Sequence, residues 1–456
     1  MNKISFLRKC IDVFSLLLIN NKANSTTERI RDLIKIEDYH ILLTNVANYM
    51  LSYPEASEDD IRHIVYNCSG VSKQIDNMVY KKRLVPGMVI GLKAGNYEQI
   101  IMKGNKNETT LVDGVIKEKY DSIERNTLYD MGSTSKLFTL LAIYSLYDNG
   151  LIDLDKPIYE YDKRFVNLNQ VTVNDILKYK VNIIATEKIN KIQSSQQAEK
   201  IIFNSIVSIV DNSKLSYSDI DAMVLKYVVE SIAKCTLDYY LNTVIFNTSN
   251  MASTTLNVSE GNLSRIAHNN FSSVVDTNGT IITDFKATPG VVYDAKARML
   301  SNGFKNASGH AGYFTSVSDM MKLNDKIINK EIISGESLNS LTYMNRNLSI
   351  VPQILSDNTI MNTSYTGVIN LIDPLNNISI FNASNRLQNR IHRVAPEINI
   401  ENDCGLLKYK NHIASLNYAH EVKILNDLLA KLAVQYRFLA YVNEKKLDIK
   451  IYNKTR

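Results

Sequence analysis

The order of strand-like and helical segments is the feature that most limits how this chain can fold. Short apolar runs bounded by turn residues predict strands near both ends of the chain, at 88–92, 99–102, 367–372 and 378–381. Between them, residues 172–270 have the apolar spacing of helices, most clearly at 220–234. One sheet assembled from both ends of the chain, with an inserted helical domain, would explain this order.

These segments predict three parts. We expect an N-terminal helical extension, a sheet domain made of two stretches, and a mainly helical insert, with bounds at 1–60, at 61–150 with 300–456, and at 151–299. A helix is predicted from Ser133 to Leu146, and Asn149-Gly150 would end it. Residues 271–310 are rich in Asn, Gly and Ser and predict an extended loop, and a last amphipathic helix is expected at 421–441.

The composition excludes several classes of protein. Hydrophobic residues make up 45% of the 456 residues, which is typical of a globular chain with a large core. The net charge of +5 is spread along the chain, so no basic block predicts a nucleic-acid partner. The four cysteines and seven histidines include no Cys-x-x-Cys and no His-Glu-x-x-His pattern. We therefore expect no metal site and no cofactor.

The first 25 residues have two interpretations. Lys3, Arg8 and Lys9 precede an apolar stretch at 14–19, which resembles a signal peptide, but Asp12 interrupts it. The alternative is an amphipathic first helix, and this weak signal slightly favours a cytoplasmic location. No segment reaches the roughly 18 apolar residues that a transmembrane helix needs.

Ser133 and Lys136 form the sharpest local pattern. They lie three residues apart at the start of a predicted helix, so their side chains should share one face, one turn apart. Lys136 could activate the Ser133 hydroxyl if its amine were neutral, which burial and the positive end of the helix dipole favour. The N–H of Ser133 would be an oxyanion donor. Because Ser231 and Lys234 have the same spacing, the pattern alone also fits an exposed polar pair on a helix.

A second candidate segment, Leu215-Ser216-Tyr217-Ser218-Asp219, precedes the predicted helix at 220–234. A tyrosine at this junction could present its phenol to a cleft and relay protons near a lysine. The alternative is a core tyrosine followed by Asp219 as a simple helix N-cap.

These segments resemble the serine hydrolases that include class C β-lactamases, penicillin-binding D,D-peptidases and related esterases. That family carries Ser-x-x-Lys, then Tyr-x-Asn or Tyr-Ser-Asp, then a Lys/His-Thr-Gly strand. The stretches from Ser133 to Lys136 and from Tyr217 to Asp219 match the first two motifs in order. Residues 148–157, 292–297 and 308–315 are also similar to the family. The resemblance covers about residues 70 to 445 and implies an α/β (α+β) fold, an antiparallel sheet flanked by helices.

The third motif departs from the family pattern. The matching residues are Asn362-Thr363-Ser364, where the family usually has Lys or His first and Gly third. The missing basic residue would normally orient a substrate carboxylate, and Ser364 would hinder the close backbone approach that Gly permits. The resemblance makes the N–H of Tyr365 the second oxyanion donor and gives Thr363 a role in organising the cleft. Tyr293 stands where one subgroup tends to have His.

His310 also has two interpretations. Imidazole titrates near neutral pH, so His310 could line the cleft and assist proton transfer. We favour the alternative, a structural histidine that bonds backbone groups.

Two functions follow from the sequence. The first is a serine hydrolase in which Ser133 attacks an ester or amide, Lys136 and Tyr217 share the base and acid duties, and Asp219 organises the cleft. Esterase or D,D-peptidase action on a small acyl compound or a cell-wall-like peptide fits better than true β-lactamase action, because the third motif lacks its basic residue. The alternative is a catalytically weak or inactive binding or scaffold protein on the same fold. Members of this family usually act outside the cytoplasm, whereas the weak signal-like stretch at the N-terminus slightly favours a cytoplasmic location.

Overall fold

The computed structural model describes residues 75–413, except for gaps at 95–96, 190–191, 193, 209–217, 286–287, 302–305, 348–359, 375–376, 396, 399–400, 404–405 and 410–411. The predicted extension at 1–60, the predicted helix at 421–441 and Tyr217 all lie outside these residues. Within the described ranges, no helix is long and apolar enough to cross a bilayer.

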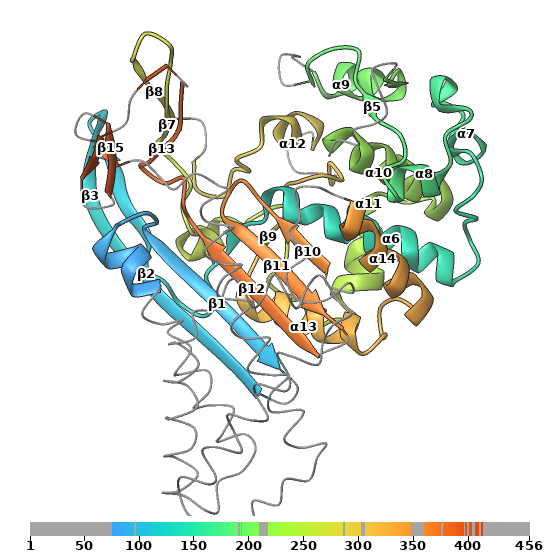
Figure 1. Cartoon of the computed structure of the whole chain (residues 1–456), viewed down its shortest axis with the longest axis horizontal. Helices are drawn as coiled ribbons and strands as arrows, with labels where there is room; N and C mark the ends of the chain where they lie inside the picture. The colour runs from blue at the N-terminus through green and yellow to red at the C-terminus, as the bar shows by residue number, and fades with distance from the viewer. Residues whose placement is uncertain are drawn as a thin grey trace, which may run out of the picture.

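A six-stranded antiparallel sheet organises the fold, with strand order β10-β11-β12-β1-β2-β3 (Figure 1). The strands are β1 (Gly87–Ala94), β2 (Tyr97–Val112), β3 (Val115–Ser122), β10 (Ile360–Thr363), β11 (Val368–Asp373) and β12 (Ile378–Ser384). The early and late halves join where β1 pairs with β12, and Ile90 lies opposite Asn382 there. This pairing confirms the prediction of one sheet built from both ends of the chain, whereas the bounds of the three parts remain predictions.

The sequence pattern predicted the second strand too short and did not predict the third. β2 continues past its predicted end at Met102 as far as Val112, and β3 was not predicted at all. Asp113 and Gly114 form the turn between them with φ angles of 51° and 74°, as a two-residue hairpin turn requires. Most of β3 is exposed on both faces, so it lacks the alternation that marks a half-buried strand.

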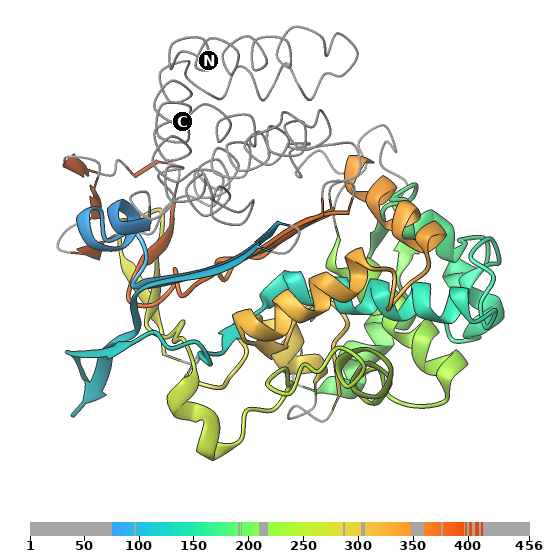
Figure 2. The same cartoon turned by 90° about the horizontal axis from the view of Figure 1, so that it is seen from below.

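Helix α13 (Val317–Ile328) packs against β1, β11 and β12 on one face of the sheet (Figure 2). Gly91 of β1 permits this contact, because a Cβ at that position would lie 2.7 Å from a methyl carbon of Val317. At the same interface the side-chain amides of Asn324 and Asn370 donate to each other, at 2.8 and 3.0 Å, and both residues are fully buried. Each amide therefore satisfies the other away from water.

Helix α6 (Lys136–Asp148) runs through the hydrophobic core. All of its residues from 136 to 146 are buried, and a helix that is enclosed on every side belongs to the interior. Helix α10 (Asp219–Ala233) packs against it, and the ring of Phe138 meets those of Phe246 and Tyr313 edge to face, at centroid distances of 4.9 and 5.3 Å. One core cluster thus joins α6, the sheet and the helical insert.

The remaining helices are shorter, apart from α14. They are α7 (Ile158–Tyr161), α8 (Val173–Leu177), α9 (Ser195–Phe203), α11 (Leu237–Tyr240), α12 (Ala295–Leu300), α14 (Gly335–Asn347) and the turns η1 (Asn77–Lys81), η2 (Gly132–Ser135), η3 (Val166–Leu168), η5 (Leu241–Phe246) and η6 (Glu260–Arg265). The predicted helix at 220–234 is α10. Ser231 donates from α10 to Asp162, and Lys234 ends that helix in a left-handed conformation. The second Ser-x-x-Lys pattern is therefore part of the helical framework.

The expectation of an extended loop at 271–310 is wrong. The segment contains the hairpin of β7 (Ser272–Val275) and β8 (Ile281–Asp284), and then helix α12. β13 (Ile391–Val394) adds to β7 in parallel. Asp276 accepts the N–H groups of Asn278 and Thr280 at 2.9 and 2.8 Å, so the polar residues that suggested a loop form a hairpin turn. The other short strands are β5 (Ile183–Ile184), β6 (Ile206–Val207), β14 (Glu401–Asp403), β15 (Leu406–Tyr409) and β16 (His412–Ile413).

Replacing Asn324 by Leu should lower the free energy of unfolding by about 1–3 kcal/mol, because the amide of Asn370 would stay buried without its partner. The measurement is equilibrium unfolding in urea. The double variant Asn324→Leu/Asn370→Leu should recover part of the loss, since both polar groups are then gone. Asn169→Leu, at an exposed position, is the matched control. A single-variant loss no larger than that of the control would contradict the prediction.

Candidate active site

Asp130 fixes the turn that leads into α6. It lies on β4 (Tyr129–Asp130), which pairs with β9 (Phe314–Thr315). Its Oδ1 accepts the N–H of Gly132 at 2.9 Å, and its Oδ2 accepts the N–H of Tyr293 at 2.7 Å. Burial raises the pKa of Asp130 to about 6, although these two N–H groups oppose the rise. The sequence did not identify Asp130, because Gly132 is two residues away whereas Tyr293 lies 163 residues further along the chain.

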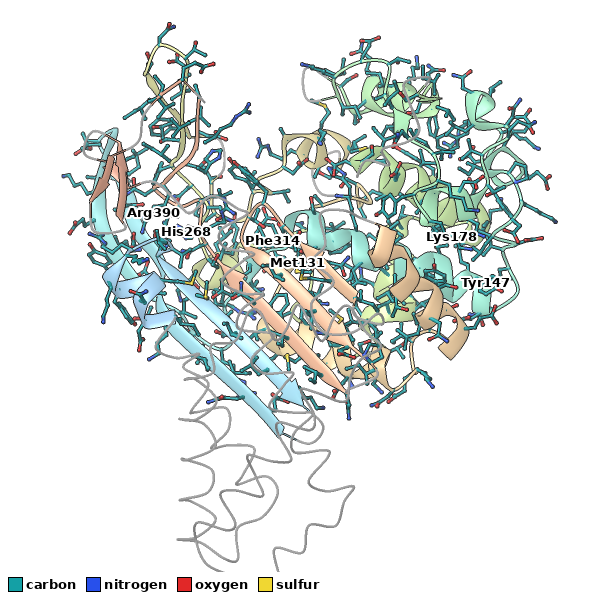
Figure 3. All side chains as sticks on the ribbon, in the orientation of Figure 1. Met131, Tyr147, Lys178, His268, Phe314 and Arg390 are labelled. Atoms are coloured by element: carbon teal, nitrogen blue, oxygen red, sulfur yellow. The ribbon has the colours of Figure 1, made fainter. Side chains whose placement is uncertain are left out.

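Ser133 lies in the turn η2, and Lys136 is the first residue of α6. The N–H of Lys136 donates to the carbonyl oxygens of Ser133 and Thr134, so Ser133 and Lys136 are one turn apart. Ser133 is half-buried and Lys136 is buried. Met131, directly before this turn, and Phe314 of β9 are both buried, and Figure 3 labels them near the middle of the view.

The third-motif segment lies directly against the turn that holds Ser133. The Thr366 hydroxyl donates to the carbonyl oxygen of Asp130 at 2.8 Å, and the hydroxyls of Ser364 and Thr366 are 2.5 Å apart. Gly132 has a φ of 45°, and a Cβ there would lie only 2.2 Å from Ser364 Oγ. Ser364 therefore does not prevent the close approach that the sequence led us to doubt, because the missing Cβ of Gly132 leaves room for its hydroxyl.

Lys136 meets the second-motif segment at Asp219, the first residue of α10. Lys136 Nζ donates to Asp219 Oδ1 at 2.6 Å, and Lys296 Nζ of α12 binds Asp219 Oδ2. Burial alone would raise the pKa of Asp219, but its electrostatic interactions with the neighbouring Lys136, His310 and Lys296 hold it well below its usual range. Asp219 is therefore a carboxylate, and it favours the ammonium form of Lys136. This charge opposes the neutral amine that the sequence hypothesis requires.

His310 is only 1% exposed and both of its ring nitrogens have side-chain partners. Nε2 lies 3.0 Å from Asp294 Oδ1, and Nδ1 lies 3.1 Å from Ser308 Oγ. Asp294 also caps α12 by accepting the N–H of Ala297. Burial would raise the pKa of Asp294, but its hydrogen bond with His310 lowers it to about 2. The carbonyl oxygen of His310 lies 3.5 Å from Lys136 Nζ, so this segment also forms one wall of the lysine site.

The ligand atoms of Asp219, Asp294 and His310 lie within 4.8 Å of one another, a grouping that could hold a metal ion. No spacing in the sequence indicated it, since the three residues come from separate segments. The contacts of Asp219 do not fit a cation, because both of its oxygens already bind ammonium groups. The grouping acts instead as a network of charged hydrogen bonds.

Asn362 and Thr363 end β10 and are half-buried. Asn362 Oδ1 is buried and has no hydrogen-bond partner in the part of the chain that the structure describes. The amide occupies the position where the family pattern has a basic residue, so this edge of the site lacks that positive charge.

A cluster of aromatic rings flanks the third motif. The Tyr365 hydroxyl contacts His392 Nδ1, and the Tyr293 hydroxyl lies 3.1 Å from His392 Nε2. Burial, together with the positive charges of Arg386 and Arg393, lowers the pKa of His392 to about 4, so the ring is neutral near pH 7. Tyr365 is 40% exposed, which leaves part of it open to solvent. Sequence reasoning missed His392, although the departure at Tyr293 was a signal that this region is unusual.

Comparison with known proteins agrees with this geometry. The beta-lactamase family model matches residues 105–397. A protein of Salmonella heidelberg (strain SL476), provisionally named D-alanyl-D-alanine carboxypeptidase, is 28% identical over 306 residues, which cover 57% of this chain and 70% of that protein.

Two solved structures share the fold. The class C beta lactamase from Rhodobacter sphaeroides has a TM-score of 0.52 at 15% identity, with 80% of this chain and 98% of that chain covered. The D-amino acid amidase from Ochrobactrum anthropi SV3 has a TM-score of 0.53 at 13% identity, with coverage of 82% and 98%. At these identities the likeness is evidence of the fold alone. The family model, however, spans more than half of the sequence, and this chain belongs to the beta-lactamase family of serine hydrolases.

Proposed function

We propose that this serine hydrolase works by acyl transfer with Ser133 as its nucleophile. Ser133 Oγ attacks the carbonyl carbon of an ester or amide, and its proton passes to Lys136 and Tyr217, which share the base and acid duties. That proton then moves to the leaving alkoxide or amine as its bond to the carbonyl carbon breaks. Water attacks the resulting acyl-serine ester, releases the acid and restores the Ser133 hydroxyl.

One observation carries this proposal: three segments that are far apart in the sequence meet around the turn at Ser133. Lys136 binds Asp219, which lies 83 positions further along the chain. Thr366 binds the backbone of Asp130 across 236 positions, and Ser364 packs against Gly132. An exposed polar pair on a structural helix would need none of these contacts.

The backbone N–H groups of Ser133 and Tyr365 are the proposed oxyanion donors. Two backbone hydrogen bonds support the role of Tyr365, because they hold its turn in place. Ser364 N–H donates to the Val368 carbonyl at 2.8 Å, and Gly367 N–H donates to the Ser364 carbonyl at 3.2 Å. In this proposal Thr363 and Asp219 organise the cleft, and His310 holds the loop beside Lys136.

We infer an esterase or D,D-peptidase-like activity on a small acyl compound or a cell-wall-like peptide. The uncharged Asn362 weighs against any substrate with a free carboxylate, a β-lactam or a D,D-peptide alike, because a basic residue would hold that group, and it therefore favours esterase action most. The name of the Salmonella relative, a D-alanyl-D-alanine carboxypeptidase, supports a peptide substrate.

A catalytically weak binding protein is the second candidate. The Asp219 carboxylate favours it, since this charge stabilises the protonated, non-basic form of Lys136. On this alternative the same cleft would bind an acyl or peptide ligand without forming a covalent bond to Ser133.

Ser133→Ala should abolish covalent labelling by a neutral fluorophosphonate probe, a loss of at least about 100-fold in rate, because the attacking oxygen is gone. Gel fluorescence and mass spectrometry of the labelled peptide provide the measurement. Ser231→Ala is the matched control, since Ser231 has the same Ser-x-x-Lys spacing, and it should keep the labelling. If undenatured wild type reacts with neither this probe nor a fluorescent penicillin, the binding alternative becomes the better explanation.

Gly132→Ala should slow the labelling of Ser133 by at least about tenfold, because a methyl group 2.2 Å from Ser364 Oγ must displace the nucleophile turn. The double variant Gly132→Ala/Ser364→Gly should recover part of the rate, since the collision with Ser364 Oγ is removed, while the strain of the positive φ and a 3.0 Å contact with Thr366 Oγ1 remain. Labelling kinetics measure both effects. Equal rates for the single and double variants would show that the contact does not position Ser133.

Asn362→Lys should raise the rate of acylation by a fluorescent penicillin about tenfold relative to the neutral fluorophosphonate, because a charge-assisted hydrogen bond contributes about 1.5–3 kcal/mol. The ratio of the two labelling rates is the measurement, so any general loss of activity cancels. A ratio equal to that of wild type would contradict the assignment of residue 362 to the carboxylate-binding edge.

A further inference from the structure

Lys136 and Lys296 share one carboxylate, and this arrangement resolves a conflict in the proposed mechanism. Lys136 donates to Asp219 Oδ1, and Lys296 binds Asp219 Oδ2. Asp219 by itself would hold Lys136 as an ammonium ion and so remove the base. We infer that Lys296 is a positioning residue that weakens this hold and keeps Lys136 an effective base; the inference rests on the proposed function.

Lys296 acts on Lys136 in two ways. It takes the second oxygen of Asp219, so the negative charge of that carboxylate is divided between two ammonium groups. It also places a second positive charge next to Lys136, and a like charge at this range disfavours protonation. Both effects promote release of the proton from Lys136.

The two lysines that share Asp219 differ in their exposure to water. The side chain of Lys136 is 8% exposed, whereas that of Lys296 is 31% exposed. Lys296 therefore keeps part of its hydration, whereas Lys136 is almost cut off from water, and such desolvation makes a charged amine costly. The same carboxylate thus binds the partly hydrated amine of Lys296 and the buried amine of Lys136, which is the proposed base.

Among the described residues, the acidic groups near Lys136 and the His310 segment offer it no second ammonium group in place of Lys296. From α10, Asp221 also faces Lys136, but burial raises its pKa well above the usual range and so favours its neutral form. Asp294, at the start of α12, is bonded to His310, and the His310 segment offers Lys136 a carbonyl oxygen.

The position of Lys296 is fixed by the segment around it. Asp294 caps α12 through the Ala297 N–H at 2.8 Å, and the Arg298 guanidinium donates to the carbonyl oxygens of Val292 and Tyr293 at 2.6 and 2.8 Å. These bonds set the first turn of α12, which presents Lys296 to α10. The ammonium group is therefore held at the site by the fold of its own segment.

The test is the pH dependence of Ser133 labelling by a neutral fluorophosphonate in the full chain. Lys136 is active when deprotonated, and removal of a neighbouring positive charge favours its protonated form. Lys296→Met should therefore move the acidic limb of the rate profile to higher pH by about one unit, with rates about tenfold lower below the midpoint. Lys296→Arg keeps the charge and should leave the midpoint where it is in wild type.

Lys200→Met is the matched control, because Lys200 is an exposed lysine on α9, the helix that packs against α12. It removes the same formal charge and should not shift the midpoint. Thermal unfolding of each variant confirms that it is folded. A Lys296→Met midpoint equal to that of wild type would overturn the inference while leaving the proposed role of Ser133 intact.

A second readout does not depend on Ser133. Trace acetylation of lysines across about pH 6 to about pH 10, analysed by mass spectrometry, gives the titration midpoint of Lys136 directly. If wild type shows no Ser133 labelling at any pH, the proposed function fails, and this titration still decides the inference. A midpoint of Lys136 that rises in Lys296→Met supports it, and an unchanged midpoint refutes it.

Discussion

The buried contact between Lys136 and Asp219 is the interaction on which the rest of the site depends. Each residue begins a core helix, Lys136 at α6 and Asp219 at α10, so the contact sets how these two helices meet. A buried ammonium group needs a partner, because the cost of removing it from water is large. The carboxylate of Asp219 satisfies that need and joins the start of α6 to the start of α10.

The altered third motif is accommodated by complementary changes elsewhere in the site. Ser364 fits because residue 132 has no side chain, so the two positions must be understood as a pair. The amide of Asn362 supplies no positive charge, and its buried Oδ1 has no hydrogen-bond partner among the described residues. Departures from a motif are therefore better interpreted in three dimensions than one position at a time.

Local patterns in the sequence predicted much of this structure. The apolar runs near residues 90 and 370 indicated a sheet from both ends of the chain, and the spacing of Ser133 and Lys136 indicated the helix start. β3 escaped prediction because an exposed strand has no buried face to produce alternation. Asp130, Lys296 and His392 escaped because their roles arise from contacts with distant segments, and no local pattern records such contacts.

The order of strands in the sheet has a consequence for how the chain is made. β1 emerges early from the ribosome, yet its partner β12 ends at Ser384, so one edge of β1 must wait for nearly three hundred further residues. An unpaired strand edge is a template for association with other chains. Pairing between such distant segments is also slow to form. Protection of this open edge until β12 has been synthesised is therefore a requirement that the topology itself imposes.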